Sequence, residues 1–276
     1  MDNFFTQIEY VCFSDIGKFC SRNEDSYLCL HSDGVYVVAD GLGGGCRGDL
    51  ASKTVTEVIG EKLKHSCDES PGERIFCLNA AITEAHLAIQ KQFFEYDGNF
   101  MGSTIAGIMF NPWNSESALV FNAGDSRVYR LRNNKLCQLT FDHTVASEIM
   151  FTDKKDILKY KGVLTHAIGI KGKMYVAYSD IKIEPEDLFF ICSDGISTYI
   201  HDEQITELLA SSDIGTIPEK MIQTVYKNNG KDNATAIIIK MPKKLFPSVV
   251  QCEIDIAESK YWESKVKTLG DSYGTI

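Results

Sequence analysis

The stretch VYVVADGLGGG, residues 35–45, passes from an apolar run into an aspartate and then into a glycine-rich turn. A short run rich in β-branched residues that ends in turn-forming residues is typical of a buried strand. Asp40 therefore stands at a strand end, where the backbone is held firmly. The next residue, Gly41, allows a carbonyl group or a ligand to approach closely.

Strand and helix patterns extend from this stretch in both directions. Strands are predicted before it at 8–14 and 26–31, and two long amphipathic helices after it, one from Leu50 and one from Pro71. A tight turn at 123–126 indicates an antiparallel meander. The remaining strands are expected at 104–110, 118–122, 127–131, 174–178, 181–183, 188–192 and 234–241, and the remaining helices at 202–209 and 218–228.

Two groups of strands, each followed by a pair of helices, predict one mixed α+β domain in which helices cover packed antiparallel sheets. A doubly wound parallel sheet fits less well, because helices do not alternate with strands. Residues 142–163 lose the pattern, so we expect an irregular excursion there, with a short helix near 154–160, that borders a site. The stretch from Pro242 onward is polar and weakly patterned.

Composition excludes several classes of protein. The chain of 276 residues has 38 acidic and 28 basic side chains, a net charge of −10, which argues against nucleic acid or an anionic membrane as the main partner. Nine cysteines without a Cys-x-x-Cys pair fit reduced thiols, so we expect no structural zinc. The N-terminus has no basic start, and no apolar run approaches the roughly 20 residues that span a bilayer. A cytoplasmic protein is expected.

Acidic residues recur at the ends of the apolar strands beside small or turn-forming residues: Glu24, Asp25, Asp40, Asp125, Asp194 and Asp232. Aspartate and glycine also populate ordinary turns, so the pattern alone leaves that interpretation open. If these carboxylates converge, however, they require cations, and oxygen ligands favour Mg²⁺ or Mn²⁺ over zinc. Two such ions, typically ~3.5–4 Å apart, lower the pKa of a water from ~15.7 toward ~7. That chemistry hydrolyses a phosphate ester without a protein nucleophile.

Seven short motifs make the interpretation specific. They resemble, in order, the motif series of the metal-dependent protein phosphatase (PPM) family in its compact bacterial form, over about residues 8–240. One such motif would be weak evidence, but seven in the same order make coincidence improbable. The motifs are SDIG at 14–17, RNEDS at 22–26, ADGLGG at 39–44, MGST at 101–104, NAGDSR at 122–127, SDG at 193–195 and KDNAT at 231–235.

The resemblance implies a four-layer α/β/β/α sandwich of two antiparallel sheets flanked by helices. It implies a catalytic domain at 1–245, with a flap at about 142–165 beside the active site, and leaves 246–276 as a tail with no assigned role. The implied activity is hydrolysis of phosphoserine and phosphothreonine by a metal-activated water. The expected partners are phosphorylated proteins, namely a serine/threonine kinase and its substrates, and a monomer is expected.

The resemblance also assigns metal ligands. Asp40 would bridge two catalytic Mn²⁺ or Mg²⁺ ions, the Gly41 carbonyl would help to hold one of them, and Asp194 and Asp232 would complete the other. Asp125 would share a weaker third site with Asp194. The carboxylates expected to orient metal-bound waters are Glu24 and Asp25.

One position departs from the family pattern. Where relatives carry a phosphate-binding arginine, three residues before the Asn-Glu-Asp motif, this chain has Cys20. Arg22 would lie on the same face of an extended segment and can take over that role. The alternative is a pseudophosphatase, a PPM-fold module that binds phosphoproteins without turnover. His143 and His166 are candidate general acids, although a structural role is the main interpretation for each.

Overall fold

The computed structural model describes residues 4–42, 47–95, 101–148, 160, 162–172, 174–210 and 213–245. Its strands form two antiparallel sheets, in which neighbours in each order are hydrogen-bonded. The first sheet has the order β1 (Glu9–Asp15), β11 (Ala234–Lys240), β10 (Leu188–Cys192), β7 (Arg127–Arg132) and β8 (Lys135–Gln138). The second has the order β2 (Asp25–Leu30), β3 (Val35–Leu42), β5 (Ile105–Phe110), β6 (Ser117–Ala123) and β9 (Ala177–Lys182), with β4 (Gly102–Ser103) paired to β3.

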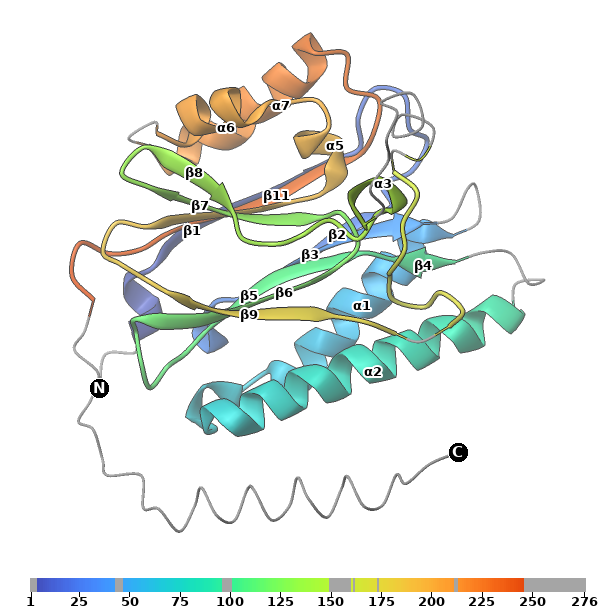
Figure 1. Ribbon diagram of the computed structural model, residues 1–276, viewed down its shortest axis with the longest axis horizontal. Coiled ribbons are helices and arrows are strands. Elements are labelled where there is room, and N and C mark those ends of the chain that lie inside the picture. The colour runs from blue at the N-terminus through green and yellow to red at the C-terminus, as the bar shows by residue number, and fades with distance from the viewer. Residues whose placement is uncertain are drawn as a thin grey trace.

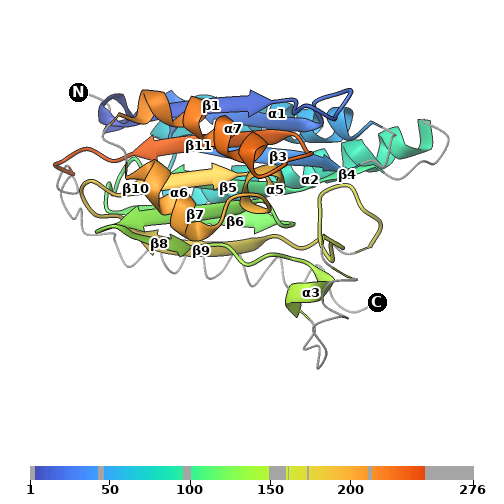
Figure 2. The same ribbon diagram turned by 90° about the horizontal axis from the view of Figure 1, so that it is seen from above.

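Helices cover the outer face of each sheet, so the molecule has four layers (Figure 1). Those over the second sheet are α1 (Gly48–Leu63) and α2 (Pro71–Glu95), and those over the first are α5 (Asp194–Ser197), α6 (Asp202–Leu209) and α7 (Ile217–Lys227). The short α3 (Val145–Glu148) lies apart from both layers (Figure 2). The predicted four-layer α/β/β/α sandwich is confirmed. Single turns of 3₁₀ helix occur at Phe4–Gln7, His31–Asp33, Ser66–Asp68 and Ile214–Thr216.

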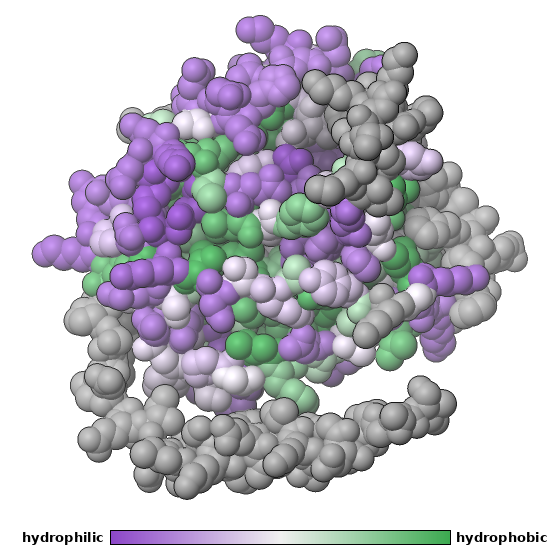
Figure 3. All heavy atoms as spheres, viewed as in Figure 1, coloured by the Kyte–Doolittle hydropathy of each residue, from purple (hydrophilic) through white to green (hydrophobic). Residues whose placement is uncertain are grey.

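Three apolar clusters hold the layers together, one at each interface between neighbouring layers. In α7, Ile217, Met221 and Val225 are buried at helical spacing against the first sheet. The outer surface of α6 and α7 is hydrophilic (Figure 3). At the start of α2, the Ser70 N–H donates to Glu73 Oε2 at 3.0 Å and the Glu73 N–H to Ser70 Oγ at 3.4 Å. This capping box explains why the helix begins there.

The predicted meander at 118–131 is wrong. β6 pairs with β5 and β9 in the second sheet, whereas β7 pairs with β10 and β8 in the first, so the chain changes sheets at 123–126. Gly124 makes the change with φ +112°, and a Cβ there would lie 2.6 Å from the Thr104 methyl group. Only glycine fits such a position readily. Asp125 therefore lies between the two sheets rather than at the tip of a hairpin.

Other elements differ in smaller ways. The strands expected at 174–178 and 181–183 are one strand, β9, and the short strands β4 and β8 were not predicted. The helix expected near 154–160 falls almost wholly outside the described residues. Within the part of the chain that the structure describes, no helix is long and apolar enough to cross a membrane.

Candidate active site

The strand-end acids meet at one end of the sandwich. Asp25, the first residue of β2, stands opposite Asp40 of β3 in the sheet register. β4 and α3 lie at this end in both ribbon views (Figures 1 and 2). The cleft there has a volume of about 360 Å³, and its lining residues are Glu24, Asp40, Gly41, Leu42, Asp125, Gly162, Leu164, Asp194, Asp232 and Asn233. Six of the seven predicted metal-site residues thus line one cleft, and the seventh, Asp25, is the partner of Asp40 on the neighbouring strand.

The backbone around Asp40 is tightly fixed. Its N–H donates to Thr104 Oγ1 at 3.0 Å, and its carbonyl accepts the Thr104 N–H at 2.8 Å and the Ser103 hydroxyl at 3.1 Å. The Thr104 hydroxyl is in turn bonded to Ser126 Oγ at 2.7 Å. Within the described residues, the Asp40 carboxylate has no hydrogen-bond or ion-pair partner. The strand therefore presents this carboxylate to the cleft in a fixed position.

The acids repel one another strongly. Burial raises the pKa of Asp40 well above its ordinary range, and the charges of Asp25, Asp194, Asp125 and Asp232 raise it further. Burial also raises the pKa of Asp25 to about 7, with Asp194 and Asp232 adding to the shift. The pKa of Asp125 is likewise raised to about 7, by burial first and by Asp194 second. A cation bound in the cleft would therefore favour the ionised forms of Asp25, Asp40 and Asp125 near neutral pH.

The donor set fits Mg²⁺ or Mn²⁺. The cleft lining offers carboxylate and carbonyl oxygens without cysteine or histidine, which selects hard cations. Among the described residues, no group of three or more histidine, cysteine, aspartate or glutamate side chains is arranged to hold an ion alone. Ions of this class are commonly bound through one or two carboxylates and retain several waters, so a shared and hydrated arrangement suits the cleft.

Glycines shape the wall of the cleft beside Glu24. A Cβ on Gly41 would lie 2.1 Å from the Gly48 carbonyl oxygen, and a Cβ on Gly48 would lie 2.6 Å from Glu24 Oε2. The start of α1 therefore packs directly on the strand end that carries Asp40. Burial raises the pKa of Glu24, as do the nearby charges of Asp49 and Asp232, while Arg22 and the Gly48 N–H partly oppose the shift.

Arg22 lies beside the cleft rather than in it. Together with Phe19, Cys20 and Ser21, it lines a second pocket of about 440 Å³, which shares Glu24, Asp232 and Asn233 with the cleft. Residues 16–24 form a loop rather than an extended segment, yet Cys20 and Arg22 still face the same pocket. The Cys20 thiol donates to the Lys231 carbonyl at 3.3 Å.

Asn233 positions this loop and was not predicted as a site residue. Its Oδ1 accepts the Glu24 N–H at 2.8 Å, and its Nδ2 donates to the carbonyls of Ile16 at 2.7 Å and Arg22 at 3.0 Å. One amide side chain thus joins the loop of Arg22 and Glu24 to the start of β11. The KDNAT motif contains Asn233, and that was the signal available in the sequence.

Ser193 is a second residue that sequence reasoning missed. Its hydroxyl donates to Asp25 Oδ2 at 2.8 Å, immediately before Asp194. The two histidines, by contrast, do not line the cleft. His143 is buried, accepts the Gly124 N–H at 3.3 Å and packs edge-to-face with His166 at 5.4 Å between ring centroids. These contacts support the structural interpretation for both histidines.

Comparison with known proteins agrees with this geometry. The family model described as protein phosphatase 2C matches residues 20–233. The serine/threonine phosphatase Stp of Listeria monocytogenes is 30% identical over 241 residues, covering 82% of this chain and 93% of the relative. The crystal structure of the Mycobacterium tuberculosis serine/threonine phosphatase PstP/Ppp aligns with a TM-score of 0.75 at 25% identity, over 85% of this chain and 99% of that one.

A further solved structure, the catalytic domain of the phosphatase PstP in complex with two manganese ions, aligns with a TM-score of 0.74 at 25% identity, over 85% of this chain and 98% of that one. The matched family region contains every strand-end acid predicted from the sequence, from Glu24 to Asp232. The resemblance seen in the seven motifs is confirmed: the chain belongs to the protein phosphatase 2C family of metal-dependent protein phosphatases.

Proposed function

We propose that this protein hydrolyses phosphoserine and phosphothreonine side chains of other proteins, using two Mn²⁺ or Mg²⁺ ions and a weaker third. The observation that carries the proposal is the cleft in which Asp40, Asp125, Asp194 and Asp232 converge, so that the charges of the other three acids raise the pKa of Asp40 beyond the effect of its burial. The relatives are named serine/threonine phosphatases, and one solved relative contains two manganese ions.

Each acid has a proposed part in this chemistry. Asp40 would bridge the two principal ions, Gly41 would contribute its carbonyl, and Asp194 and Asp232 would complete the second site. Asp125 would join Asp194 in the third. When bound, the ions supply a water of lowered pKa and screen the charge of the phosphoryl group. The remaining carboxylates, Glu24 and Asp25, accept hydrogen bonds from water in the cleft and so orient it.

Arg22 is proposed to hold the substrate phosphate. Its planar guanidinium can donate two parallel hydrogen bonds to phosphate oxygens. The pocket that it lines shares a wall with the cleft, so a phosphate bound there would be adjacent to the ions. Asn233 supports this role because it fixes the Arg22 carbonyl relative to β11. We expect loss of the Arg22 side chain to raise KM for the phosphopeptide more than it lowers kcat.

The biological setting is also a proposal. A cytosolic serine/threonine kinase and the proteins that it phosphorylates are the expected partners, and residues 1–245 are the proposed catalytic unit of a monomer. No observation favours a pseudophosphatase, since the acids of the cleft are complete and the relatives are named phosphatases.

The test is hydrolysis of a phosphothreonine peptide by the purified protein with Mn²⁺, with a chelator, and after the substitution Asp194→Asn. Asp180→Asn in the exposed part of β9 is a matched control, because it makes the same chemical change outside the cleft. We expect Mn²⁺-dependent phosphate release from the wild type and from Asp180→Asn, and none from Asp194→Asn. A folded, metal-loaded wild type that released no phosphate would overturn the proposal.

A further inference from the structure

Two edge strands from different sheets face each other beside the loop of Arg22. β1 is the edge of the first sheet (Figure 2) and β2 is the edge of the second. At one end of β1, the Tyr10 ring stacks on His31 with 4.7 Å between centroids. Toward the other end, Ser14 Oγ accepts a hydrogen bond from Asn23 Nδ2 at 2.7 Å. These two contacts show that β1 and β2 run in opposite directions along each other.

The middle of this contact is a pair of cysteines. Side chains two residues apart on a strand share a face, so Cys12 lies between Tyr10 and Ser14 on the face of β1 that meets β2. In the same way Cys29 of β2 lies two residues before His31, on the side that faces β1. Both cysteines are half-buried, and both pack against the same apolar cluster between the sheets. Neither belongs to the proposed catalytic machinery.

We propose that Cys12 and Cys29 are a modification site at which a low-molecular-weight disulfide such as oxidised glutathione forms a reversible disulfide bond between the two sheets. One cysteine thiolate attacks a sulfur of oxidised glutathione, which forms a mixed disulfide and releases one glutathione thiolate. The second cysteine then loses its proton, attacks the protein sulfur of the mixed disulfide and displaces the second glutathione. The protein loses two electrons and two protons, and oxidised glutathione is reduced to two thiols.

The order of attack follows from the surroundings of the two thiols. Burial raises the pKa of Cys29, and the neighbouring Cys12 raises it further. A thiol whose pKa is raised is a slower nucleophile near neutral pH. Cys12 is therefore the first to react, and Cys29 resolves the mixed disulfide. Reduction by excess thiol reverses both steps.

The bond would close a covalent ring from Cys12 to Cys29. This ring contains the whole loop at 16–24, including Arg22 and Glu24, which lie beside the cleft. A disulfide restricts the unfolded chain and so stabilises the fold, and a ring of this size corresponds to a rise in Tm of about 5 °C or more for a domain of this length. The inference concerns the covalent state of the fold and holds whether or not the proposed phosphatase activity is correct.

The experiment is to incubate the folded full-length protein in glutathione buffers of increasing oxidised fraction, block free thiols, digest without reductant and identify cross-linked peptides by mass spectrometry. We expect one dominant cross-link, between Cys12 and Cys29, together with the rise in Tm, both reversed by dithiothreitol. Cys12→Ser and Cys29→Ser should each abolish the cross-link and the rise. Cys137→Ser, at an exposed cysteine of β8, should retain both.

Three results would overturn the inference, and each is read on the wild type, so none depends on the folding of a variant. The first is the absence of the cross-link in folded protein at the highest oxidised fraction. The second is glutathione that stays on Cys12 without resolution by Cys29. The third is preferential pairing of either cysteine with Cys20, the other cysteine in the ring.

Discussion

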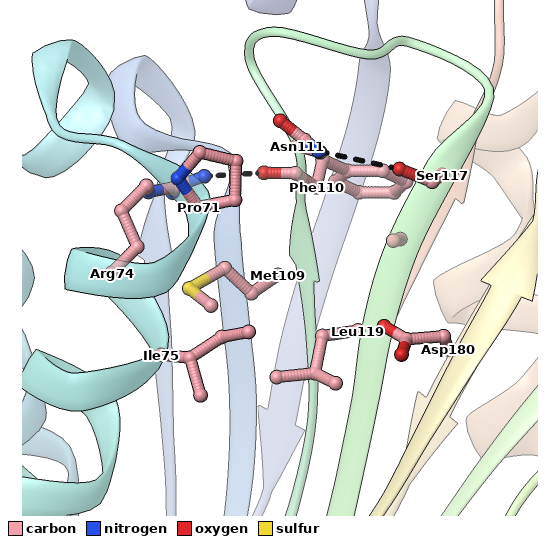
Figure 4. Close-up of a pocket in the computed structure, with 10 residues that line it drawn as sticks. Pro71, Arg74, Ile75, Met109, Phe110, Asn111, Ser117, Leu119 and Asp180 are labelled. Carbon is pink, nitrogen blue, oxygen red and sulfur yellow. Dashed lines mark hydrogen bonds between the residues drawn. The ribbon is translucent and has the colours of Figure 1, made fainter. Parts of the chain in front are cut away.

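The two ends of the sandwich differ in whether their charged side chains have partners within the chain. At the cleft, the half-buried carboxylates of Asp40, Asp125 and Asp194 lie together, and the Asp40 carboxylate has no ion-pair partner among the described residues. At the far end, beyond the last residue of β5, Arg74 is 1% exposed, and each of its three guanidinium nitrogens donates a hydrogen bond within the chain. It donates to the Phe110 carbonyl at 2.5 Å, as Figure 4 shows, to Ser66 Oγ at 3.4 Å and to the Asp33 carbonyl.

A second buried charge at the far end, Asp187, has an ion-pair partner within the chain. Arg132, the last residue of β7, donates to both carboxylate oxygens of Asp187 at 2.6 Å, and the Asp187 side chain is 0% exposed. The contrast teaches how to separate structural from functional charge in this fold. A charged side chain whose hydrogen-bond or ion-pair partners come from the chain holds the structure together, whereas one left without such a partner is available to a ligand.

The largest expected effect is on activity at the cleft. Asp40→Asn removes the proposed bridging ligand, so phosphate release with Mn²⁺ should fall by about 10²-fold or more. The same change removes one of several carboxylates that repel one another in the cleft, so the free energy of unfolding of the metal-free protein should not decrease. Peptide hydrolysis and urea unfolding with chelator measure the two effects. Wild-type activity in Asp40→Asn would contradict the functional role assigned to the unpartnered carboxylate of the cleft.

The reverse outcome is expected at the far end. Arg74→Met leaves the carbonyls of Phe110 and Asp33 without their buried donor, which should lower the free energy of unfolding by about 2–4 kcal/mol. The kcat of the folded variant should stay within about twofold of wild type, because the substitution lies outside the cleft. Lys62→Met is the control: its ion pair with Glu84 is exposed, and the unfolding midpoint should not change. An unchanged midpoint for Arg74→Met would contradict the structural role.

The stabilisation of the fold by Mn²⁺ should depend on the residues of the cleft and not on those of the far end. At an Mn²⁺ concentration about 100 times the dissociation constant, binding to the folded state alone stabilises it by about 2.7 kcal/mol. Calorimetric or urea unfolding with and without Mn²⁺ should show this increment in the wild type and in Arg74→Met. The increment should be smaller in Asp40→Asn. An equal increment in both variants would place the ions away from the cleft.

The smallest expected effect is the pH dependence of the free energy of unfolding. In the metal-free protein the pKa values of Asp25 and Asp125 are raised to about 7, above the ordinary value of 3.8 for an aspartate. The folded state thus binds more protons than the unfolded state between these values, so its stability should fall as pH rises through that window. The expected slope is on the order of 1 kcal/mol per pH unit, measured by urea unfolding with chelator. Stability that rose through the same window would contradict mutual repulsion.

The strand-end acids were accessible from the sequence because each adjoins an apolar run and a turn residue. The sheet change between β6 and β7 was not, because Ala123-Gly124-Asp125-Ser126 reads as a tight turn whichever sheet the next strand joins. The pairing of β7 with β10 decides which sheet β7 joins. The paired residues Val128 of β7 and Ile191 of β10 are far apart in the chain.

The residues that the sequence analysis missed share this dependence on distant contacts. The bonds of Asn233 to Ile16, Arg22 and Glu24 join residues more than 200 positions apart. A pattern in a local window contains no information on such a bond. β4 and β8 are too short, at 2 and 4 residues, to show a period.

The pairing of β1 with β11 has a consequence for synthesis on the ribosome. Glu9 pairs with Lys240 and Asp15 with Ala234. β1 is translated before the other strands and β11 after them, so β1 cannot form its sheet hydrogen bonds until β11 has been translated. Asp232 and Asn233, directly before β11, also emerge late. A nascent chain therefore cannot assemble the cleft until nearly all of the described domain has been translated. Until β11 is translated, one edge of β10 also has no strand to pair with. During this interval the nascent chain is most exposed to mispairing with other chains.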